Sequence, residues 1–190
     1  IRLLSGLLRP TSGSALLFGL PPQSQEARRL FSLSPQETAV AGNLTVWENL
    51  ELIAGIYDRS VACAARVCTA LGLDEVKRQR AKTLSGGWQR RLSIAMALAS
   101  EPKLLFLDEP TLGLDVLARR ELWHLIEGLK GSVTIILTTH YMEEAEHLSD
   151  RVGILADGRL RTCGTPAELM AQAQTDRFEE AFVRLAGGAQ

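Results

Sequence analysis

Two adjacent carboxylates, Asp108 and Glu109, follow an apolar run that spans Leu104–Leu107. The run has the length of a strand buried on both faces, and ligands gather at the carboxyl ends of strands in open parallel sheets. Adjacent carboxylates are costly to desolvate there unless a cation or a substrate uses them. We therefore predict that Asp108 binds Mg²⁺, through water, and that Glu109 polarises an attacking water. The alternative is that both acids cap the following turn.

Ser85, Gly86 and Gly87 precede a segment in which apolar residues recur at helical spacing. Glycines at a helix start let backbone N–H groups approach an anion, and the helix dipole favours negative charge at that end. The Ser85 hydroxyl adds a further donor. The three residues therefore predict a phosphate-binding helix start. The alternative is a serine N-cap followed by two loop glycines.

His140 and Gln36 each follow a predicted strand. His140 lies just beyond a second apolar run, Val133–Leu137, and parallel pairing of the two runs would bring it near the carboxylate pair. A neutral imidazole there can donate to a phosphate oxygen or hold the attacking water. The side-chain amide of Gln36 can help to coordinate Mg²⁺ or orient a water. The alternative for both residues is a purely structural position.

The elements that position these residues follow an α/β pattern. Leu104–Leu107 and Val133–Leu137 are joined by a segment whose apolar residues recur at helical spacing between positions 118 and 129. Such a strand–helix–strand unit predicts parallel strands. A further strand, Val152–Leu155, is followed by Asp157-Gly158, which favours a tight hairpin turn into Leu160–Cys163.

The front of the chain predicts short elements. Apolar residues within 1–8 predict a helix, which the turn residues of Arg9–Gly13 would end. A short strand over Ser14–Phe18, a polar helix over Ser24–Leu30 and a short strand over Phe31–Leu33 are expected next.

The stretch between Gln36 and Leu84 predicts helices and no strand. Thr45 and Glu48 have the spacing of a capping box, in which each side chain binds the backbone of the other residue. A second helix is expected over Val61–Leu71.

Composition narrows the classes of function. Lys and Arg number 21 against 22 Asp and Glu, which gives a net charge of −1, so no long-range field favours a nucleic-acid partner. The three cysteines have neither zinc-site nor C-x-x-C spacing. No apolar run approaches the roughly 18 to 20 residues needed to cross a bilayer. Any membrane role must therefore depend on another chain.

Taken in order, these motifs resemble those of the ATP-binding cassette of ABC transporters. The matches are LSGGW at 84–88 with the signature LSGGQ, LLFLDE at 104–109 with the Walker B motif, Leu114-Asp115 with the D-loop, TTH at 138–140 with the H-loop, and Pro35-Gln36 with the Q-loop. The stretches SGGWQRR, LDEPTLGLD, THYMEEAEHLSDRV and FEEAFVRL look most like the drug-efflux, ABC-2-type exporter branch. The resemblance covers essentially the whole chain.

The resemblance implies one partial cassette over residues 1–190, of the α/β class. It would be a P-loop NTPase core with a mostly parallel sheet and an inserted α-helical subdomain. The helical signature subdomain is expected at 42–100 and the catalytic core, with Walker B and the H-loop, at 101–165. A C-terminal helical segment is expected at 166–190.

The resemblance also implies ATP and Mg²⁺ as cofactors and a head-to-tail dimer of cassettes as the working unit. Ser85, Gly86 and Gly87 would contact the γ-phosphate on the partner cassette, Asp115 would line the dimer interface, and Gln36, Asp108, Glu109 and His140 would act on their own nucleotide, with Asp108 and Gln36 on the metal side. Residues near Gln36 and the helix from Thr45 would face a transmembrane subunit. The cassette would then lie at the cytoplasmic face of the cell membrane.

Two departures from the family pattern affect this expectation. Trp88 stands at the last signature position, with Gln89 one step later. Because Ser85 and the glycine amides make the expected contacts, we expect phosphate binding to survive. Nothing matches the Walker A loop, G-x-x-x-x-G-K-[ST], whose amides and lysine cradle phosphates. By resemblance, that loop and the N-terminal strands would precede Ile1, so we expect these 190 residues alone to hydrolyse ATP poorly.

Two other functions stay open. One is a non-transport ABC ATPase of the DNA-repair or translation-factor kind, but the helical insertion before Ser85 is compact and has no heptads. The other is a non-catalytic remnant without Walker A. Intact Glu109 and His140 instead favour truncation of a longer gene product.

Overall fold

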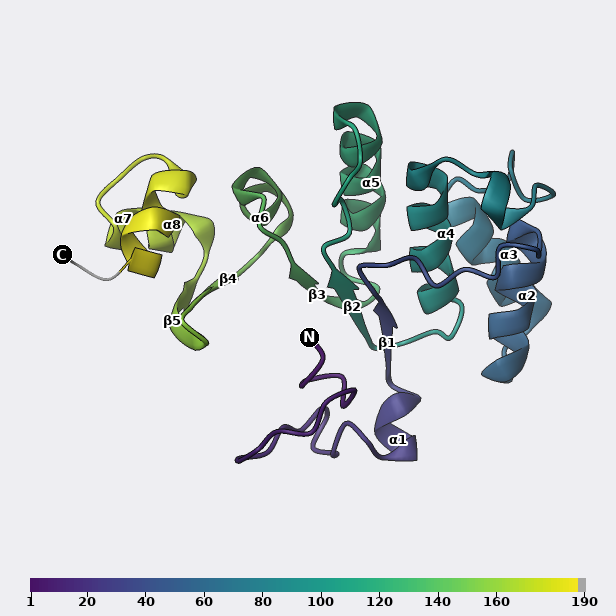
Figure 1. Cartoon of the computed structure of the whole chain (residues 1–190), viewed down its shortest axis with the longest axis horizontal. Helices are drawn as coiled ribbons and strands as arrows, with labels where there is room; N and C mark the ends of the chain where they lie inside the picture. Colours follow the sequence, from purple (N-terminus) through teal and green to yellow (C-terminus); the bar gives the residue numbers. More distant parts are fainter. Residues whose placement is uncertain (188–190) are drawn as a thin grey trace. The chain divides into compact units, whose positions relative to one another are not determined.

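The computed structural model describes residues 1–187 and divides the chain into two compact units, Ile1–Thr138 and the part from Thr139 onward (Figure 1). The division falls inside the 101–165 segment expected to form the catalytic core. The last three residues of the expected 166–190 segment lie outside the described residues. The motif-based division of the cassette stays a prediction.

The first unit is built on a parallel sheet of order β1-β2-β3 (Figure 1). Its strands are β1 (Phe31–Ser34), β2 (Leu104–Asp108) and β3 (Thr134–Thr138). The pairing places Ser34 opposite Leu107, and Asp108 opposite Thr138. Leu104–Leu107 is buried throughout. The predicted parallel strands and the burial of the first apolar run are therefore confirmed.

The expectation that Val133–Leu137 is buried on both faces is wrong. The strand begins one residue later, Thr134 and Ile136 are exposed, and the remaining residues of β3 are half-buried. Among the described residues β3 pairs only with β2 and is therefore an edge strand. Its apolar composition is typical of a central strand.

Two expectations for the front of the chain are also wrong. Residues 2–8 form turns instead of a helix, because their four leucines are exposed and Gly6 adopts φ +71°, which no α-helix contains. The strand expected at Ser14–Phe18 reduces to a single bridge between Leu17 and Leu20. Phe18 and Gly19, with φ of 53° and 79°, make the tight turn between them.

Three of the helices described in the first unit begin at a residue whose side chain caps them: Ser24, Thr45 and Asp115. The helices of this unit are α1 (Gln25–Arg28), α2 (Val46–Ile56), α3 (Val61–Ala70), the 3₁₀ turn η1 (Ala81–Thr83), α4 (Gly86–Leu98) and α5 (Val116–Leu129). The predicted capping box is present at α2: the Thr45 hydroxyl accepts from the Glu48 amide at 3.1 Å, and the Glu48 carboxylate accepts from the Thr45 amide at 2.7 Å. The two reciprocal bonds fix the start of α2.

Helix α4 is attached to the sheet through buried hydroxyl pairs. Ser34 on β1 bonds Ser93 on α4 at 3.0 Å, and Ser32 bonds Ser100, just beyond the helix, at 2.6 Å. Because all four hydroxyls are buried, each needs a partner, and the two pairs fix the register of α4 along β1. The helix that starts at the predicted phosphate-binding residues is therefore attached firmly to the sheet.

The second unit packs a hairpin against three helices. Its elements are α6 (Met142–Leu148), β4 (Val152–Ala156), β5 (Arg159–Gly164), α7 (Pro166–Gln172) and α8 (Phe178–Gly187). Asp157 and Gly158, with φ of 50° and 71°, form the predicted turn between antiparallel β4 and β5. Ala145, Ile154, Leu169 and Phe178 form the buried core. Among residues 1–187, no helix is long and apolar enough to cross a membrane.

Candidate functional site

Asp108 and Glu109 lie at the end of β2, where Thr138 of β3 contacts both residues. The Thr138 hydroxyl donates to Asp108 Oδ1 at 2.6 Å. The Glu109 amide donates to the Thr138 carbonyl at 3.1 Å and lies 3.3 Å from its hydroxyl. Both carboxylate residues are half-buried. Thr138 thus orients Asp108 and fixes the backbone of Glu109 at the sheet edge where ligands gather.

Glu109 adopts a left-handed backbone conformation, with φ 49°. A residue with a β-carbon seldom adopts this conformation, and it persists where neighbouring bonds hold it. Here the Glu109 amide is held by Thr138, and its carbonyl accepts from the Leu112 amide at 3.2 Å. The chain therefore leaves the strand in a tight turn that presents two consecutive carboxylates at its start.

A buried arginine joins this turn to the Gln36 loop. Arg90, on α4, is only 4% exposed. Its Nη1 donates to the Pro35 carbonyl and its Nη2 to the Gln36 carbonyl, both at 2.6 Å, and Nη2 lies 3.5 Å from the Glu109 carbonyl. One guanidinium therefore links α4, the loop after β1 and the turn after β2.

Arg90 is a residue of the candidate site that the sequence did not predict. The signal was its spacing: Arg90, Ile94 and Ala97 lie on one buried face of α4. A charge at a core position of a helix requires hydrogen-bonding partners at its end, since an unpaired buried charge is strongly unfavourable. The backbone carbonyls of the Gln36 loop are those partners.

Gln36 itself is exposed and lies two residues beyond the end of β1. The structure brings its backbone onto the same guanidinium as Glu109. The proposed action of its side-chain amide on a metal or water stays a prediction.

The start of α4 leaves its donors exposed. Ser85 is the N-cap residue, but its hydroxyl makes no capping bond. A β-carbon on Gly86 would have no heavy atom within 4 Å, whereas one on Gly87 would meet the Ala118 β-carbon at 3.3 Å. Gly86 therefore faces open space, and Gly87 allows α4 and α5 to approach closely. The alternative, in which the Ser85 side chain caps its own helix, is not supported, because the hydroxyl makes no such hydrogen bond.

Asp115 has a local role in the structure. It is the N-cap of α5, and its Oδ1 accepts from the Ala118 amide at 2.9 Å. The residue is exposed. Its expected place in a dimer interface stays a prediction beside this helix-capping role.

His140 follows Thr138 by two residues and is the second residue of the second unit. It is exposed, and its ring lies 4.2 Å from that of Tyr141, with the planes tilted by 37°. The Tyr141 amide donates to the Thr139 hydroxyl at 2.9 Å. The approach of His140 to Glu109 stays a prediction.

Comparison with known proteins decides the family. A family model described as "ABC transporter" matches residues 1–112 of the 190. The chain belongs to the ABC transporter family. Family membership implies ATP binding, and the parallel three-stranded sheet with its surrounding helices is the fold that solved ABC subunits share. One such structure, an ATP-binding subunit of an ABC transporter, superposes with a TM-score of 0.82 at 28% identity, covering 97% of this chain and 80% of that one.

Two relatives have names that refer to drugs. The probable multidrug ABC transporter ATP-binding protein YbhF of Escherichia coli K12 is 39% identical over 97% of this chain and 34% of its own length. The daunorubicin/doxorubicin resistance ATP-binding protein DrrA of Streptomyces peucetius is 38% identical over 89% of this chain and 53% of its own length. The chain thus spans about a third and about half of these two proteins.

The departure from the ABC signature, Trp88, is packed. The Arg91 guanidinium lies 4.6 Å from the centre of the Trp88 ring, and Arg91 also pairs with Glu121 on α5. The Gln89 side chain donates through Nε2 to the Leu84 carbonyl at 3.1 Å. Trp88 therefore packs on the arginine that links the start of α4 to α5.

The residues at the Walker B end fit a Mg²⁺ site of the nucleotide-bound kind. Residues 1–187 contain no group of three or more His, Cys, Asp or Glu side chains that could hold a metal ion unaided. Mg²⁺ is commonly held by one or two carboxylates together with water and substrate phosphates. The oriented carboxylate of Asp108 meets that requirement.

Proposed function

We propose that this chain is part of the ATP-binding and ATP-hydrolysing subunit that powers an ABC exporter. The observation that carries the proposal is the linkage through Arg90 and Thr138, which joins the Q-loop, the signature helix and the Walker B carboxylates. These parts must move together if nucleotide bound at the end of the sheet is to change the position of a membrane partner. The name of YbhF, which refers to a multidrug transporter, and that of DrrA, which refers to drug resistance, support export as the direction of transport.

In this proposal Asp108 and Glu109 divide the chemistry at the end of β2. Asp108, oriented by the Thr138 hydroxyl, would hold Mg²⁺ through water, with Gln36 on the same side of the nucleotide. Bound Mg²⁺ neutralises charge on the phosphate oxygens. Glu109 would polarise the attacking water, and His140 would hold that water or donate to the γ-phosphate.

Ser85, Gly86 and Gly87 would serve a second cassette. Their amides and the Ser85 hydroxyl lie at the start of a 13-residue helix, where the dipole attracts anions. We propose that they bind the γ-phosphate held by the partner in a head-to-tail dimer, with Asp115 at the interface. Hydrolysis would then require both cassettes.

The membrane partner would dock beside α2. The helical segment 42–100 and the loop after Gln36 form one side of a cavity that Ile53, Tyr57 and Met96 help to line. We propose that a cytoplasmic segment of a transmembrane subunit enters there, so that the cassette lies at the cytoplasmic face of the membrane. Movement of that segment would be transmitted to the turn after β2 through the contacts of Arg90.

The 190 residues contain no G-x-x-x-x-G-K-[ST] loop. Since the amides and lysine of that loop cradle the β- and γ-phosphates, we propose that these residues alone turn over little ATP. A steady-state rate from the isolated chain that disappears in Glu109→Gln would contradict this.

Co-purification from membranes tests the transport function. A full cassette containing this chain, tagged and expressed in its own host, should be recovered with a polytopic membrane protein, and ATP turnover should be higher in the complex. Recovery with ribosomes or DNA instead of a membrane protein would favour the non-transport ATPase. A complex that forms but never hydrolyses ATP would favour the non-catalytic remnant.

A further inference from the structure

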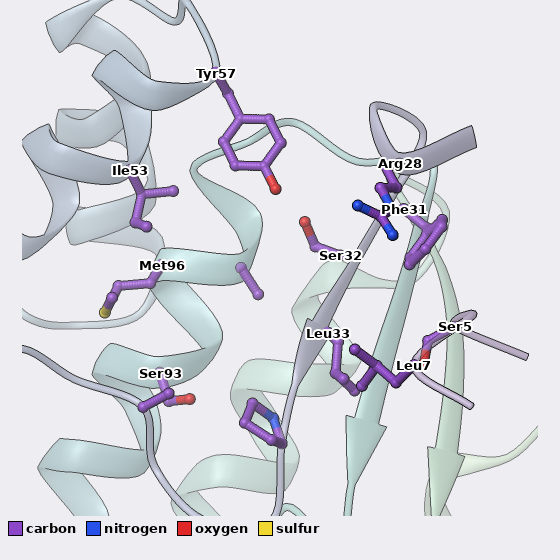
Figure 2. A pocket seen from close by; sticks show the side chains of 13 residues that line it. Ser5, Leu7, Arg28, Phe31, Ser32, Leu33, Ile53, Tyr57, Ser93 and Met96 are labelled. Carbon is purple, nitrogen blue, oxygen red and sulfur yellow. The ribbon is translucent and has the colours of Figure 1, made fainter. Parts of the chain in front are cut away.

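Helix α4 is attached to β1 from its second turn onward. Arg90 bonds the carbonyls of the loop after β1, and the Ser93 hydroxyl bonds that of Ser34 on β1 at 3.0 Å. Through Ser93 and Met96 the helix also lines the pocket between β1 and the helices α2 and α4 (Figure 2). These contacts fix the body of the helix, and its first turn depends on a different neighbour.

That neighbour is α5. A β-carbon on Gly87 would meet the Ala118 β-carbon at 3.3 Å, so the two helices approach closely at this point. One turn further along α4, the Arg91 guanidinium pairs with the Glu121 carboxylate on α5. The ring of Trp88 covers the same guanidinium, with 4.6 Å between the ring centre and Cζ. A close backbone approach and a covered ion pair therefore join the start of α4 to α5.

Arg91 is enclosed, unlike most arginines of surface ion pairs. Its side chain is 14% exposed, whereas that of Glu121 is 63% exposed. Its Nη1 lies 3.6 Å from the position that a β-carbon on Gly72, after α3, would take. An enclosed charge needs a partner, which Glu121 supplies, and the Trp88 ring is a favourable surface for a cation. The planar guanidinium therefore has a defined position between two helices.

The position of the first turn of α4 matters because its proposed ligand groups are backbone amides. A backbone amide cannot be redirected by rotating a side chain, so a phosphate site made of amides is only as well placed as the helix that carries it. Helix α5 begins at its N-cap Asp115, just beyond the turn that presents Glu109. The contacts between α4 and α5 thus connect the phosphate donors of α4 to the carboxylate turn.

We infer that Arg91 is a positioning residue: held by Glu121 and Trp88, it sets where the amides at the start of α4 lie relative to α5. The inference rests on the proposed function, in which these amides bind the γ-phosphate held by a partner cassette. Arg91 itself would touch neither the nucleotide nor the attacking water. Its loss should therefore weaken the association of two cassettes and leave the binding of ATP by each single cassette unchanged.

ATP-dependent dimerisation tests this role. Full cassettes that contain this chain carry Glu109→Gln, so that bound ATP persists, and ultracentrifugation gives the protein concentration at which half is dimeric. Arg91→Met should raise that concentration about tenfold or more, because misplaced donors lose their contacts with the phosphate. Glu121→Gln, which keeps Arg91 but removes the charge of its partner, should raise it about twofold to fivefold. Arg91→Lys keeps the ion pair and should stay closer to the parent cassette than Arg91→Met.

Glu127→Gln is the matched control. It removes a carboxylate from the same helix, but Glu127 pairs with His124 of α5 itself, at 3.4 Å. Dimerisation of this variant should equal that of the parent cassette. ATP binding by the monomer, measured at concentrations below dimerisation, should be equal in all of the variants.

Three results would overturn the role of Arg91. The first is equal dimerisation by the parent cassette and Arg91→Met, or by the parent and Glu121→Gln where Arg91→Met does not fold. The second is a loss of monomer ATP binding that matches the loss of dimerisation, since a general folding defect would explain both. The third is dimerisation of Arg91→Lys as weak as that of Arg91→Met. If the parent cassette forms no dimer with ATP, the proposed head-to-tail dimer fails, and the positioning role fails with it.

Discussion

At the scale of single residues, two side chains hold together the corner formed by the loop after β1 and the turn after β2. Arg90 bonds two carbonyls of the Q-loop at 2.6 Å, and Thr138 bonds Asp108 at 2.6 Å. Neither residue is expected to touch the reacting atoms. Both fix the positions of residues that would.

Replacing Arg90 should show how much the corner depends on it. Arg90→Met leaves the carbonyls of Pro35 and Gln36 without their charged donor, so we expect the free energy of unfolding to fall by about 2–4 kcal/mol. Arg90→Lys should recover part of that loss, because an ammonium reaches fewer carbonyls than a guanidinium fork. Urea denaturation measures both variants. A loss below about 0.5 kcal/mol for Arg90→Met would show that the buried contacts stabilise little.

Thr138→Val tests the hydroxyl that orients Asp108. It removes the bond to Asp108 and an acceptor beside the Glu109 amide, so we expect a loss of stability near 1 kcal/mol. In a full cassette it should also raise the Mg²⁺ concentration needed for half-maximal ATP turnover. Thr134→Val, on the same strand and exposed, should change neither quantity. Equal effects from the two variants would contradict a specific role for the Thr138 hydroxyl.

At the scale of elements, apolar periodicity predicted most of the first unit but not the context of each element. Runs of apolar residues located β2 and β3, apolar residues at helical spacing located α5, and the capping box located α2. The same runs could not show that β3 occupies an edge or that residues 2–8 form turns, because both depend on which neighbours cover them. Arg90 was missed for a related reason: its role depends on carbonyls 54 and 55 positions away in sequence.

Leu122→Ala tests the packing of α5. Leu122 is 1% exposed, so truncation should leave a cavity and lower stability by about 2–5 kcal/mol. Leu117→Ala, on the same helix with Leu117 73% exposed, should stay within about 0.5 kcal/mol of the original chain. Denaturant unfolding compares the two variants. A similar loss in both would contradict the buried face assigned to α5.

At the scale of the whole molecule, the chain carries two compact units with separate cores. The proposed dimer and membrane complex use surfaces of the first unit, at the start of α4 and beside α2. The candidate residues were predicted almost entirely from motif order, whereas the linkage among them required the structure.

The rates at which the three cysteines react with a thiol reagent measure the opening of the two units separately. Burial, with the nearby Glu101 carboxylate, raises the pKa of the Cys63 thiol, and burial with Asp74 raises that of Cys68. Cys163, in the second unit, is exposed. We expect a thiol reagent to label Cys163 first and the other two only as the first unit opens, and Cys163→Ser should remove the fast phase. Rapid labelling of all three would contradict the buried assignment.

The raised pKa values also set a direction for stability against pH. Because the folded state favours the neutral thiols, their contribution is fully present below the ordinary thiol pKa of 9.0. That contribution is lost as the pH rises through the raised folded values. Stability of the first unit should therefore fall in the alkaline range, and Cys63→Ala with Cys68→Ala should reduce the slope.

The central claim is that Glu109, at the end of β2, activates water in an ABC ATPase. Its most direct test is ATP turnover by a full cassette that contains this chain, assembled with its membrane subunit. Glu109→Gln should lower kcat by about 10²-fold or more while ATP binding is retained, and Glu75→Gln, an exposed carboxylate away from the corner, should leave kcat unchanged. Turnover by Glu109→Gln at the rate of the original protein would contradict the account.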